Sequence, residues 1–448
     1  MNIAVILAGG KGSRFGSKTP KQFLRLAGRY IIEYTIEVFE KNKNIDEICI
    51  VSHRDYTEQF NEIVIKNNFK KVKKIISGGK ERSDSSFNAI QAYKGIQCNL
   101  IFHDGVRPFI TQKIINNTIE ALKIYNAVDV AIPSADTIIE IDTNNIIKDI
   151  PKRANLRRGQ TPQAFHRDTI EKAYKLFFQD KNKPPFTDDC GLVRHYLHED
   201  IFVVEGDETN IKITYPADLL FAEKLIQLHS VKLEEESFDL QDKVLIVFGG
   251  SSGIGKDIVS IAQKSGAKVY SFSKTTGYDI TDIANVQKAF DTVMQKEQKI
   301  DYIINTVGIL KRKELIDLSY EEIDEFLDIN LKSSIYIAKI AYQYLNEHTM
   351  ILFFTSSSYT RGRSSYSLYS STKAAIVNLT QALSEEFADK EIMVNCINPA
   401  RTLTPMRIKN FGKEPEGSLL SSQEVAKRTL QVLSQKISGQ IIDIKKGL

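Results

Sequence analysis

The sequence contains no tryptophan, and only 4 cysteines, 5 methionines and 11 prolines in 448 residues. The cysteines, Cys49, Cys98, Cys190 and Cys396, lie far apart and lack the paired spacing of zinc ligands or of a disulfide scaffold. We therefore expect four unpaired thiols, which are typical of a reducing compartment, and a cytoplasmic location.

Long apolar runs and a strong net charge are also missing. No run approaches the roughly 20 apolar residues of a membrane helix, and the short apolar start, residues 1–7, lacks the charged segment of a signal peptide. A net charge of +4 is small for this length and argues against a nucleic-acid partner. We therefore expect neither membrane nor nucleic acid as a partner, and small anionic ligands for the basic motifs.

Both halves of the sequence alternate short β-branched runs with amphipathic helical stretches. This pattern is typical of parallel α/β sheets, and a length of 448 residues with 42% hydrophobic content suits two domains. We predict two Rossmann-like three-layer α/β domains, at residues 1–228 and 239–448, joined by a polar linker at 229–238. The expected strands are 3–7, 48–52, 74–77, 100–103 and 128–132, then 243–248, 268–273, 302–305, 350–354 and 393–397, with a closing helix of the first domain at 219–228.

A glycine-rich motif, LAGGKGSR at residues 7–14, follows the first predicted strand, and PKQ at 20–22 closes it. A glycine-rich turn after a buried strand presents backbone N–H groups to phosphate oxygens, and Arg14 and Lys21 add positive charge. Residues 11–15 lack the third glycine of the dinucleotide fingerprint. The motif therefore indicates a site for a nucleoside triphosphate.

Two more polar segments follow predicted strands. GGKERSDS at residues 78–85 suits contacts with a base and a ribose, and HDGVRP at 103–108 ends a strand with the carboxylate of Asp104. A carboxylate there is a suitable oxygen ligand for a magnesium ion held by a triphosphate. Lys212 supplies a second cation close to another strand end.

With these motifs, residues 1 to about 228 resemble the cytidylyltransferases that activate methylerythritol phosphate or ribitol phosphate. The resemblance implies a nucleotidyltransferase fold that binds CTP and Mg²⁺, with Asp104 as the metal ligand and Arg14, Lys21 and Lys212 as catalytic residues. It also implies CTP contacts for Leu7, Ala8, Gly9, Gly10, Gly79, Lys80 and Ser85, and sugar-phosphate contacts for Asp136, Thr137, Arg153, Thr161 and Thr187. A phosphate monoester oxygen is already anionic at neutral pH, so alignment and charge neutralisation suffice without a general base.

The second half contains a different set of motifs. GGSSGIG at residues 249–255 lies between a predicted strand and a helix, the arrangement that seats a dinucleotide pyrophosphate. Tyr369 and Lys373 are four residues apart and share a helix face, so the ammonium group favours the tyrosinate. Ser356, thirteen residues before Tyr369, would hydrogen-bond the same substrate oxygen, with Ser357 and Ser358 as alternatives.

Together with Asn330, these residues resemble the short-chain dehydrogenases/reductases, over residues 239–448. The resemblance implies catalytic roles for Asn330, Ser356, Tyr369 and Lys373. It implies a nicotinamide cofactor held by Gly249, Ser251, Ser252, Gly253, Ile254, Ser273, Lys274, Asp279, Asn305, Tyr369 and Lys373. The second predicted strand of this half ends in Ser273 and Lys274 without an acid, which favours the 2′-phosphate of NADPH over the ribose hydroxyls of NADH.

The two halves together resemble a family of bifunctional enzymes of bacterial capsule or teichoic-acid pathways. The resemblance implies NADPH-dependent reduction of D-ribulose 5-phosphate to D-ribitol 5-phosphate, then cytidylyl transfer from CTP to give CDP-ribitol. One alternative is a methylerythritol-phosphate cytidylyltransferase fused to a reductase of unrelated substrate; another is a regulatory or scaffold protein that binds nucleotide without turnover. Because both component families usually self-associate, we expect a homodimer formed through an arm at 138–151 and a long helix at 366–388.

Overall fold

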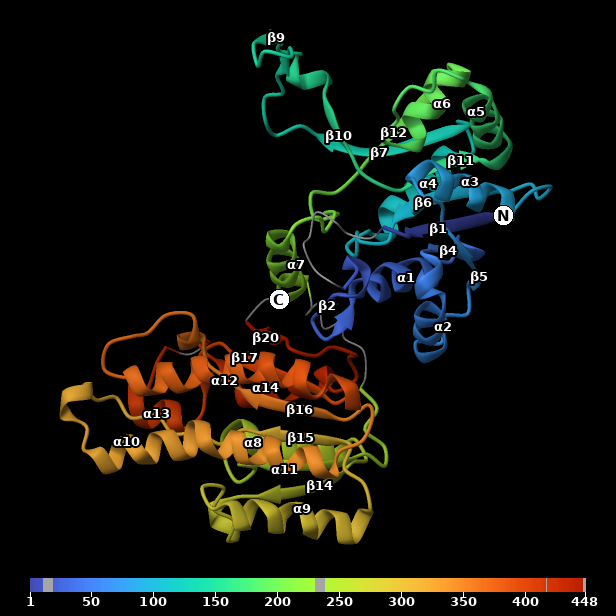
Figure 1. Cartoon of the computed structure of the whole chain (residues 1–448). Helices are drawn as coiled ribbons and strands as arrows, with labels where there is room; N and C mark the ends of the chain where they lie inside the picture. Colours follow the sequence, from blue (N-terminus) through green and yellow to red (C-terminus); the bar gives the residue numbers. More distant parts are fainter. Residues whose placement is uncertain (11–18, 230–237, 416, 446–448) are drawn as a thin grey trace. The chain divides into compact units, whose positions relative to one another are not determined.

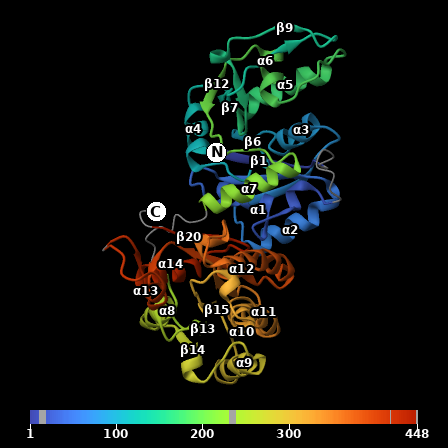
Figure 2. The same cartoon turned by 90° about the vertical axis from the view of Figure 1, so that its left-hand side faces the viewer.

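The described part of the chain forms two compact units (Figures 1 and 2). The computed structural model describes residues 1–10, 19–229, 238–415 and 417–445. The units are Met1–Glu223 and Lys224–Leu448. The predicted linker at 229–238 lies almost entirely outside the described residues, so the domain bounds 1–228 and 239–448 stay predictions.

The first unit is built on a mixed eight-stranded sheet. The strand order is β10-β7-β11-β6-β1-β4-β5, and β12 pairs with β7. β10 and β11 run antiparallel to their neighbours, whereas the other pairs are parallel. The strands are β1 (Asn2–Ala8), β4 (Glu47–Ser52), β5 (Val72–Ser77), β6 (Asn99–Asp104), β7 (Ala127–Pro133), β10 (Arg157–Gly159), β11 (Gln163–His166) and β12 (Ile201–Glu205); β2 (Arg25–Leu26) and β3 (Arg29–Tyr30) form a separate small hairpin.

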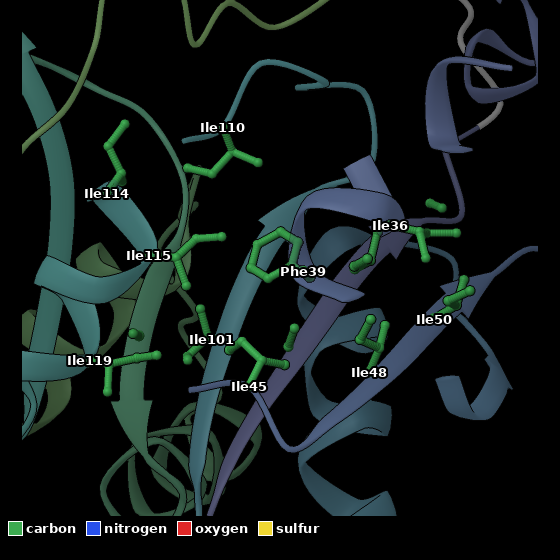
Figure 3. Packing of buried hydrophobic residues seen from close by; sticks show 14 of the residues in the cluster. Ile36, Phe39, Ile45, Ile48, Ile50, Ile101, Ile110, Ile114, Ile115 and Ile119 are labelled. Atoms are coloured by element: carbon green, nitrogen blue, oxygen red, sulfur yellow. The ribbon is translucent and has the colours of Figure 1, made fainter. Parts of the chain in front are cut away.

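Helices cover both faces of this sheet. Successive side chains along a strand point to opposite faces, and apolar side chains on both faces pack against helices. Ala4, Ile6 and Ala8 of β1 join a buried cluster with α1 (Ile31–Lys41), α2 (Thr57–Lys66) and α4 (Gln112–Ala121), part of which Figure 3 shows. Ile3 and Val5 join the opposite cluster with α3 (Arg82–Ala92), α5 (Arg167–Gln179) and α6 (Asp189–Leu197). Along the chain, α7 (Pro216–His229) spans the point at which the two units divide. The first unit is therefore a three-layer α/β domain.

An arm leaves the sheet of the first unit between β7 and β10 (Figure 1). It carries a short antiparallel hairpin of β8 (Glu140–Ile141) and β9 (Ile147–Asp149). The side chains of six isoleucines on it are exposed, namely Ile138, Ile139, Ile141, Ile146, Ile147 and Ile150. This arm corresponds to the arm predicted at residues 138–151.

The second unit is built on a parallel six-stranded sheet in the order β14-β13-β15-β16-β17-β20. Its strands are β13 (Val244–Phe248), β14 (Lys268–Phe272), β15 (Tyr302–Asn305), β16 (Met350–Phe354), β17 (Met393–Pro399) and β20 (Ile441–Ile444); β18 (Thr402–Leu403) and β19 (Leu420–Ser421) form a separate pair. One face packs against α9 (Ile283–Glu297), α11 (Ser333–Tyr344) and α12 (Ser367–Glu386), and the other against α8 (Gly253–Lys264) and α14 (Ser422–Val432). Two further helices are α10 (Tyr320–Leu327) and α13 (Pro405–Phe411).

The ten predicted strands are confirmed as β1, β4, β5, β6 and β7, and as β13 to β17. The sequence reading did not predict β10, β11, β12 and β20, which complete the two sheets. The predicted long helix at 366–388 corresponds to α12, and the four cysteines are buried free thiols. None of the helices in the described ranges is both long and apolar enough to cross a membrane.

Candidate active sites

The carboxyl end of β6 in the first unit carries a buried carboxylate, Asp104, with three cations around it. Arg82 Nη1 lies 2.9 Å from Asp104 Oδ1, and Arg107 Nε and Lys212 Nζ each lie 3.1 Å from Oδ2. The cations come from the start of α3, the loop after β6 and the segment before α7, so the fold assembles the group. We call Asp104, Arg82, Arg107 and Lys212 the Asp104 cluster; its excess of positive charge suits phosphate ligands.

The charge states in this cluster follow from burial and from the neighbouring cations. Burial alone would raise the pKa of Asp104, but the charges of Lys212, Arg82 and Arg107 outweigh it and hold that pKa well below its usual range. Burial lowers the pKa of His103 to about 4, so its ring is neutral at pH 7. His103 Nδ1 lies 2.9 Å from Thr161 Oγ1, which also accepts the backbone N–H of Asp104 at 3.2 Å. These bonds hold Asp104 in place.

The surroundings of Asp104 test the predicted magnesium site. Among the described residues, the group of three His, Cys, Asp or Glu side chains close enough to share an ion is Glu347, His348 and Glu391, which does not include Asp104. Proteins commonly hold Mg²⁺ with one or two carboxylates together with substrate phosphates and water. A single carboxylate surrounded by cations fits that arrangement, in which nucleotide phosphates and water would provide the remaining ligands.

The glycine-rich turn is described on both sides of a gap at residues 11–18. Gly9 and Gly10 follow β1, whereas the predicted catalytic residue Arg14 lies outside the described residues. After the gap, Gln22 Nε2 donates to the carbonyl of Ala8 at 2.8 Å, and Lys21 Nζ donates to the carbonyl of Ile213 at 3.2 Å. Lys21 is therefore held against the segment that carries Lys212 of the Asp104 cluster.

The loop predicted to bind the base, Gly79 to Ser85, leads directly into the cluster. Gly79 N–H donates to Ser85 Oγ at 3.1 Å, and Lys80 N–H donates to Asp84 Oδ2 at 3.1 Å. A side chain at Gly79 would place its Cβ 2.0 Å from the Cβ of Asp84, so this tight loop requires glycine there. Because Arg82 opens α3 from the same loop, Gly79, Lys80 and Ser85 adjoin the Asp104 cluster.

The residues predicted to bind the sugar phosphate fall into two groups. Thr161 lies at Asp104, and the exposed Thr187 precedes α6, whose Asp189 lies 3.5 Å from Arg82 Nη2. The other three, Asp136, Thr137 and Arg153, lie on the arm, and none of the contacts described for them reaches the Asp104 cluster. The structure therefore brings Thr161 to the cluster and leaves the arm residues apart from it.

Sequence reasoning did not identify Arg82 and Arg107 as site residues, although both contact Asp104. Each lies inside a motif that the sequence singled out, residues 78–85 and 103–108. For Arg107 the available signal is an arginine three residues after a strand-end carboxylate. Arg82 reaches Asp104 only because the fold brings the start of α3 to the carboxyl end of β6, which no local sequence pattern predicts.

In the second unit, Ser356, Tyr369 and Lys373 converge at the carboxyl end of β16. The Ser356 side chain lies near enough to the Tyr369 hydroxyl group to act on its pKa. Lys373 Nζ lies 5.8 Å from the centroid of the Tyr369 ring and donates to the carbonyl of Phe354 at 2.8 Å. Ser358 Oγ donates to Ser356 Oγ at 3.3 Å. All three adjacent serines line the same cavity, and Ser356 is the one that acts on the pKa of Tyr369.

Asn330 lies in a π-helical turn, Asp328–Lys332, between α10 and α11. Its Oδ1 accepts the N–H of Ile309 at 2.7 Å, and its Nδ2 donates to the carbonyl of Ile309 at 3.0 Å. A Cβ at the neighbouring Gly308 would lie 3.3 Å from Asn330 Oδ1 and 3.4 Å from Lys373 Nζ. Asn330 thus fixes the loop after β15 next to Lys373, and π-turns of this kind are frequent at functional sites.

Burial sets the protonation states of Tyr369 and Lys373. It raises the pKa of Tyr369, against the lowering that the sequence predicted from Lys373, although the Ser356 side chain opposes the rise. It lowers the pKa of Lys373 to about 8. At pH 7 Tyr369 therefore holds its proton and Lys373 is largely charged, which is the state required for a proton donor beside a stabilising cation.

A cavity of about 1000 Å³ opens in front of these residues and runs along the glycine-rich turn. Gly249 has φ +86°, and a Cβ at Gly255 would lie 2.3 Å from the carbonyl oxygen of Gly249. The predicted cofactor residues that line the cavity are Gly249, Ser251, Ser252, Gly253, Ile254, Ser273, Lys274, Asp279, Tyr369 and Lys373. Asn305 is not among the lining residues; its Nδ2 donates to Ser334 Oγ at 3.0 Å. A cavity of this size beside a helix start suits a dinucleotide.

Comparison with known proteins matches each half of the chain to a protein family. The profile of the family described as 2-C-methyl-D-erythritol 4-phosphate cytidylyltransferase matches residues 2–228. The profile described as enoyl-(acyl carrier protein) reductase matches residues 253–448. The bifunctional ribulose 5-phosphate reductase/CDP-ribitol pyrophosphorylase Bcs1 of Haemophilus influenzae is 49% identical over 99% of this chain and 95% of its own. This chain belongs to that family of bifunctional enzymes.

Other relatives of this bifunctional enzyme cover its first half. The 2-C-methyl-D-erythritol 4-phosphate cytidylyltransferase of Thermobifida fusca is 40% identical over 50% of this chain and 92% of its own. The crystal structure of 4-diphosphocytidyl-2C-methyl-D-erythritol synthase from Anaerococcus prevotii, 30% identical, covers 50% of this chain and 98% of its own, with a TM-score of 0.45. The bifunctional family thus combines a nucleotidyltransferase half with a short-chain reductase half that binds a nicotinamide cofactor.

Proposed function

We propose that this chain makes CDP-ribitol in two steps, by reducing D-ribulose 5-phosphate with NADPH and then transferring a cytidylyl group from CTP to D-ribitol 5-phosphate. The observation that carries the proposal is the similarity to the Haemophilus influenzae enzyme, which runs through both halves, each with its own cluster of reactive side chains. The product of the second unit has the phosphate that the first unit would activate. A capsule or teichoic-acid pathway would use the product.

In the reductase half, this chain supplies the proton and fixes the position of the ketone. Ser356 and Tyr369 would hold the C2 carbonyl oxygen, and Tyr369 would donate its proton to that oxygen as the alcohol forms. The ammonium group of Lys373 would stabilise the tyrosinate that results. Bound NADPH supplies the hydride for C2. The chain's groups therefore explain reduction with one general acid and one supporting cation.

In the transferase half, the chain aligns two anions. A phosphate oxygen of ribitol 5-phosphate attacks the α-phosphorus of CTP, and the bond from that phosphorus to the bridging oxygen of the β-phosphate breaks, which releases pyrophosphate. Lys21, Lys212 and the arginines of the Asp104 cluster would neutralise the charge on the reacting phosphates. Mg²⁺ that enters with CTP would bind at Asp104, with triphosphate oxygens as its other ligands.

Each half-reaction can be tested separately on the purified full chain. We expect NADPH oxidation with D-ribulose 5-phosphate, and pyrophosphate release when CTP and Mg²⁺ are mixed with D-ribitol 5-phosphate. Methylerythritol phosphate serves as the competing acceptor. Release of pyrophosphate with methylerythritol phosphate and none with ribitol phosphate would support the alternative fusion enzyme and contradict this proposal.

The preference for NADPH is proposed from the end of β14. Lys274 Nζ lies 3.0 Å from Asp279 Oδ2, and the side chain of Lys274 is 83% exposed, so it is accessible to a 2′-phosphate. We expect Lys274→Ala to raise the KM for NADPH about 10-fold and to leave the KM for NADH unchanged, because one charge-assisted contact is lost. Initial rates with each cofactor measure this, with the exposed Lys264→Ala of α8 as the control. Equal changes in both KM values would contradict the assignment.

The pKa of about 8 for Lys373 predicts the pH dependence of the reductase. Burial lowers this pKa, so the charge beside Tyr369 is present below pH 8 and is lost as the pH rises through that value. We expect kcat/KM for reduction to be level below pH 7 and to fall above about pH 8. Cytidylyl transfer by the same preparation is the control for unfolding. A reductase profile that stays level to pH 10 would contradict this role of Lys373.

We propose a homodimer that uses the arm. The exposed isoleucines of the arm form the kind of apolar surface that a second copy covers, and Ile146 and Ile147 are 63% and 54% exposed. We expect the double substitution Ile146→Asp, Ile147→Asp to convert the mass measured by light scattering from two chains to one. Ile124→Asp, at a 79% exposed isoleucine outside the arm, is the matched control. A wild-type protein with the mass of one chain would contradict the dimer.

A further inference from the structure

The reductase cavity is lined by cations that neither the catalytic group nor the cofactor motif uses. Besides Lys274 and Lys373, its lining includes Arg363, Arg401, Arg407 and Lys445. Lys445 Nζ lies 2.6 Å from Asp443 Oδ2, so its charge is balanced. Among the described residues, the positive charges of Arg363, Arg401 and Arg407 are not balanced one to one in this way.

Two of these arginines share a single carboxylate. Arg407 Nε and Nη2 donate to the two oxygens of Glu414 at 2.6 and 2.9 Å, and Arg401 Nη1 lies 3.4 Å from Glu414 Oε1. Glu414 is not among the residues that line the cavity. The two guanidinium groups therefore stand between this carboxylate and the cavity with one positive charge in excess.

Arg363 has no carboxylate partner among the described residues. It lies on the segment that leads from Ser356 to Tyr369, and its side chain is exposed at the cavity. The segment is anchored where Lys313 N–H donates to the carbonyl of Ser365 at 2.7 Å. Arg361, two residues earlier, is also exposed and without a described acidic partner, but it does not line the cavity. Arg363 is thus a cation without a described acidic partner at the cavity, and Arg361 provides a matched control.

A series of aromatic contacts links Arg407 to Tyr369. The guanidinium carbon of Arg407 lies 3.8 Å from the centroid of the Phe411 ring. The Phe411 and Tyr366 rings are 6.4 Å apart, and so are the Tyr366 and Tyr369 rings. The start of α12 and the helix α13 therefore meet beside Tyr369, and residues of both line the cavity.

The net charge of the three arginines and Glu414 matches a phosphate group. Three guanidinium groups and one carboxylate leave two positive charges in excess, and a phosphate monoester carries about −1.5 to −2 at pH 7. The acids that do line the cavity, Asp279, Glu325 and Asp328, are each within 3.0 Å of a lysine, at Lys274, Lys311 and Lys332. Among the described residues that line the cavity, no carboxylate is therefore left unpaired to compete for the arginines.

We infer that Arg363 binds the phosphate group of the sugar substrate in the reductase cavity, with Arg407 as the second guanidinium, and that this pair selects phosphorylated ketoses over free ones. The inference rests on the proposed reductase function. A guanidinium group presents two parallel N–H donors that match phosphate oxygens, which a lysine cannot do. The ketone would then lie between Tyr369 and this anchor, with the chain of the sugar spanning the distance.

The test compares Arg363→Ala with Arg361→Ala in the full chain. We expect Arg363→Ala to raise the KM for D-ribulose 5-phosphate about 10- to 100-fold, with kcat and the KM for NADPH within about twofold of wild type. Arg361→Ala should behave as wild type. The slow reduction of unphosphorylated D-ribulose should be the same in all three proteins. Inorganic phosphate should compete with D-ribulose 5-phosphate in the wild type and more weakly in Arg363→Ala.

Three results would overturn the inference. The first is an equal, small effect of the two substitutions on the KM for D-ribulose 5-phosphate. The second is an Arg363→Ala variant that loses activity equally with phosphorylated and free ribulose, since that indicates a structural role. The third is a selective rise of the KM for NADPH, which assigns Arg363 to the cofactor. A wild-type enzyme that reduces no ribulose 5-phosphate would instead contradict the proposed function itself.

Discussion

Replacing Tyr369 with phenylalanine is expected to lower NADPH oxidation with D-ribulose 5-phosphate by about 10²- to 10⁴-fold, the usual contribution of a positioned general acid. The substitution removes the hydroxyl group, on whose pKa Ser356 acts, and keeps the aromatic ring beside Lys373 and Tyr366. Because the residue lies in the second unit, cytidylyl transfer to D-ribitol 5-phosphate should stay at the wild-type rate. Absorbance of NADPH and release of pyrophosphate measure the two activities in one preparation.

Tyr342→Phe is the matched control for this experiment, since Tyr342 lies on α11 and does not line the cavity. We expect both activities of that variant to be unchanged. Retention of full reductase activity by Tyr369→Phe would remove Tyr369 as the proton donor. Loss of both activities in a folded Tyr369→Phe protein would contradict two independent sites.

Lys21→Ala is expected to have the opposite effect. It should lower cytidylyl transfer by about 10²- to 10³-fold, the range seen when one group that stabilises transition-state charge is removed. Lys21 is buried and held at the carbonyl of Ile213, beside the segment that carries Lys212 and so beside the Asp104 cluster. NADPH oxidation should be unaffected, because the reductase residues belong to the other unit.

Lys123→Ala is the matched control for Lys21→Ala, because Lys123 is exposed and pairs only with the neighbouring Glu120 at 2.7 Å among its described contacts. Circular dichroism and the retained reductase rate establish that Lys21→Ala is folded. If Lys21→Ala left the rate of cytidylyl transfer unchanged, the positive charge that stabilises the transition state would have to come from other residues of the site.

Many of the strands that the sequence predicted are buried on both faces, whereas β5 and β14, at the edges of the two sheets, are only partly buried. β13 is a run of five apolar residues between polar segments, and all five are buried. β11 is different, because Gln163–His166 is short, includes a glutamine and a histidine, and becomes a strand by pairing with β6 and β7. No local sequence pattern predicts those pairings, so β11, the antiparallel strand between β6 and β7, could not be predicted.

The two sites likewise differ in whether a local sequence pattern or the pairing of distant segments brings their residues together. Tyr369 and Lys373 share a helix, so their spacing alone predicts that they are neighbours. The Asp104 cluster joins Arg82, Arg107 and Lys212, and Lys212 is far from Asp104 in sequence. Its assembly depends on sheet order, which motifs do not encode.

The measurement that tests the central claim most directly is a single reaction containing the purified chain, D-ribulose 5-phosphate, NADPH, CTP and Mg²⁺, analysed by mass spectrometry. We predict one CDP-ribitol formed for each NADPH oxidised, with pyrophosphate in the same amount and no CDP-pentitol when NADPH is left out. Oxidation of NADPH without a CDP-linked product, or a CDP-linked product that forms without NADPH, would contradict the proposal that the two units act in sequence.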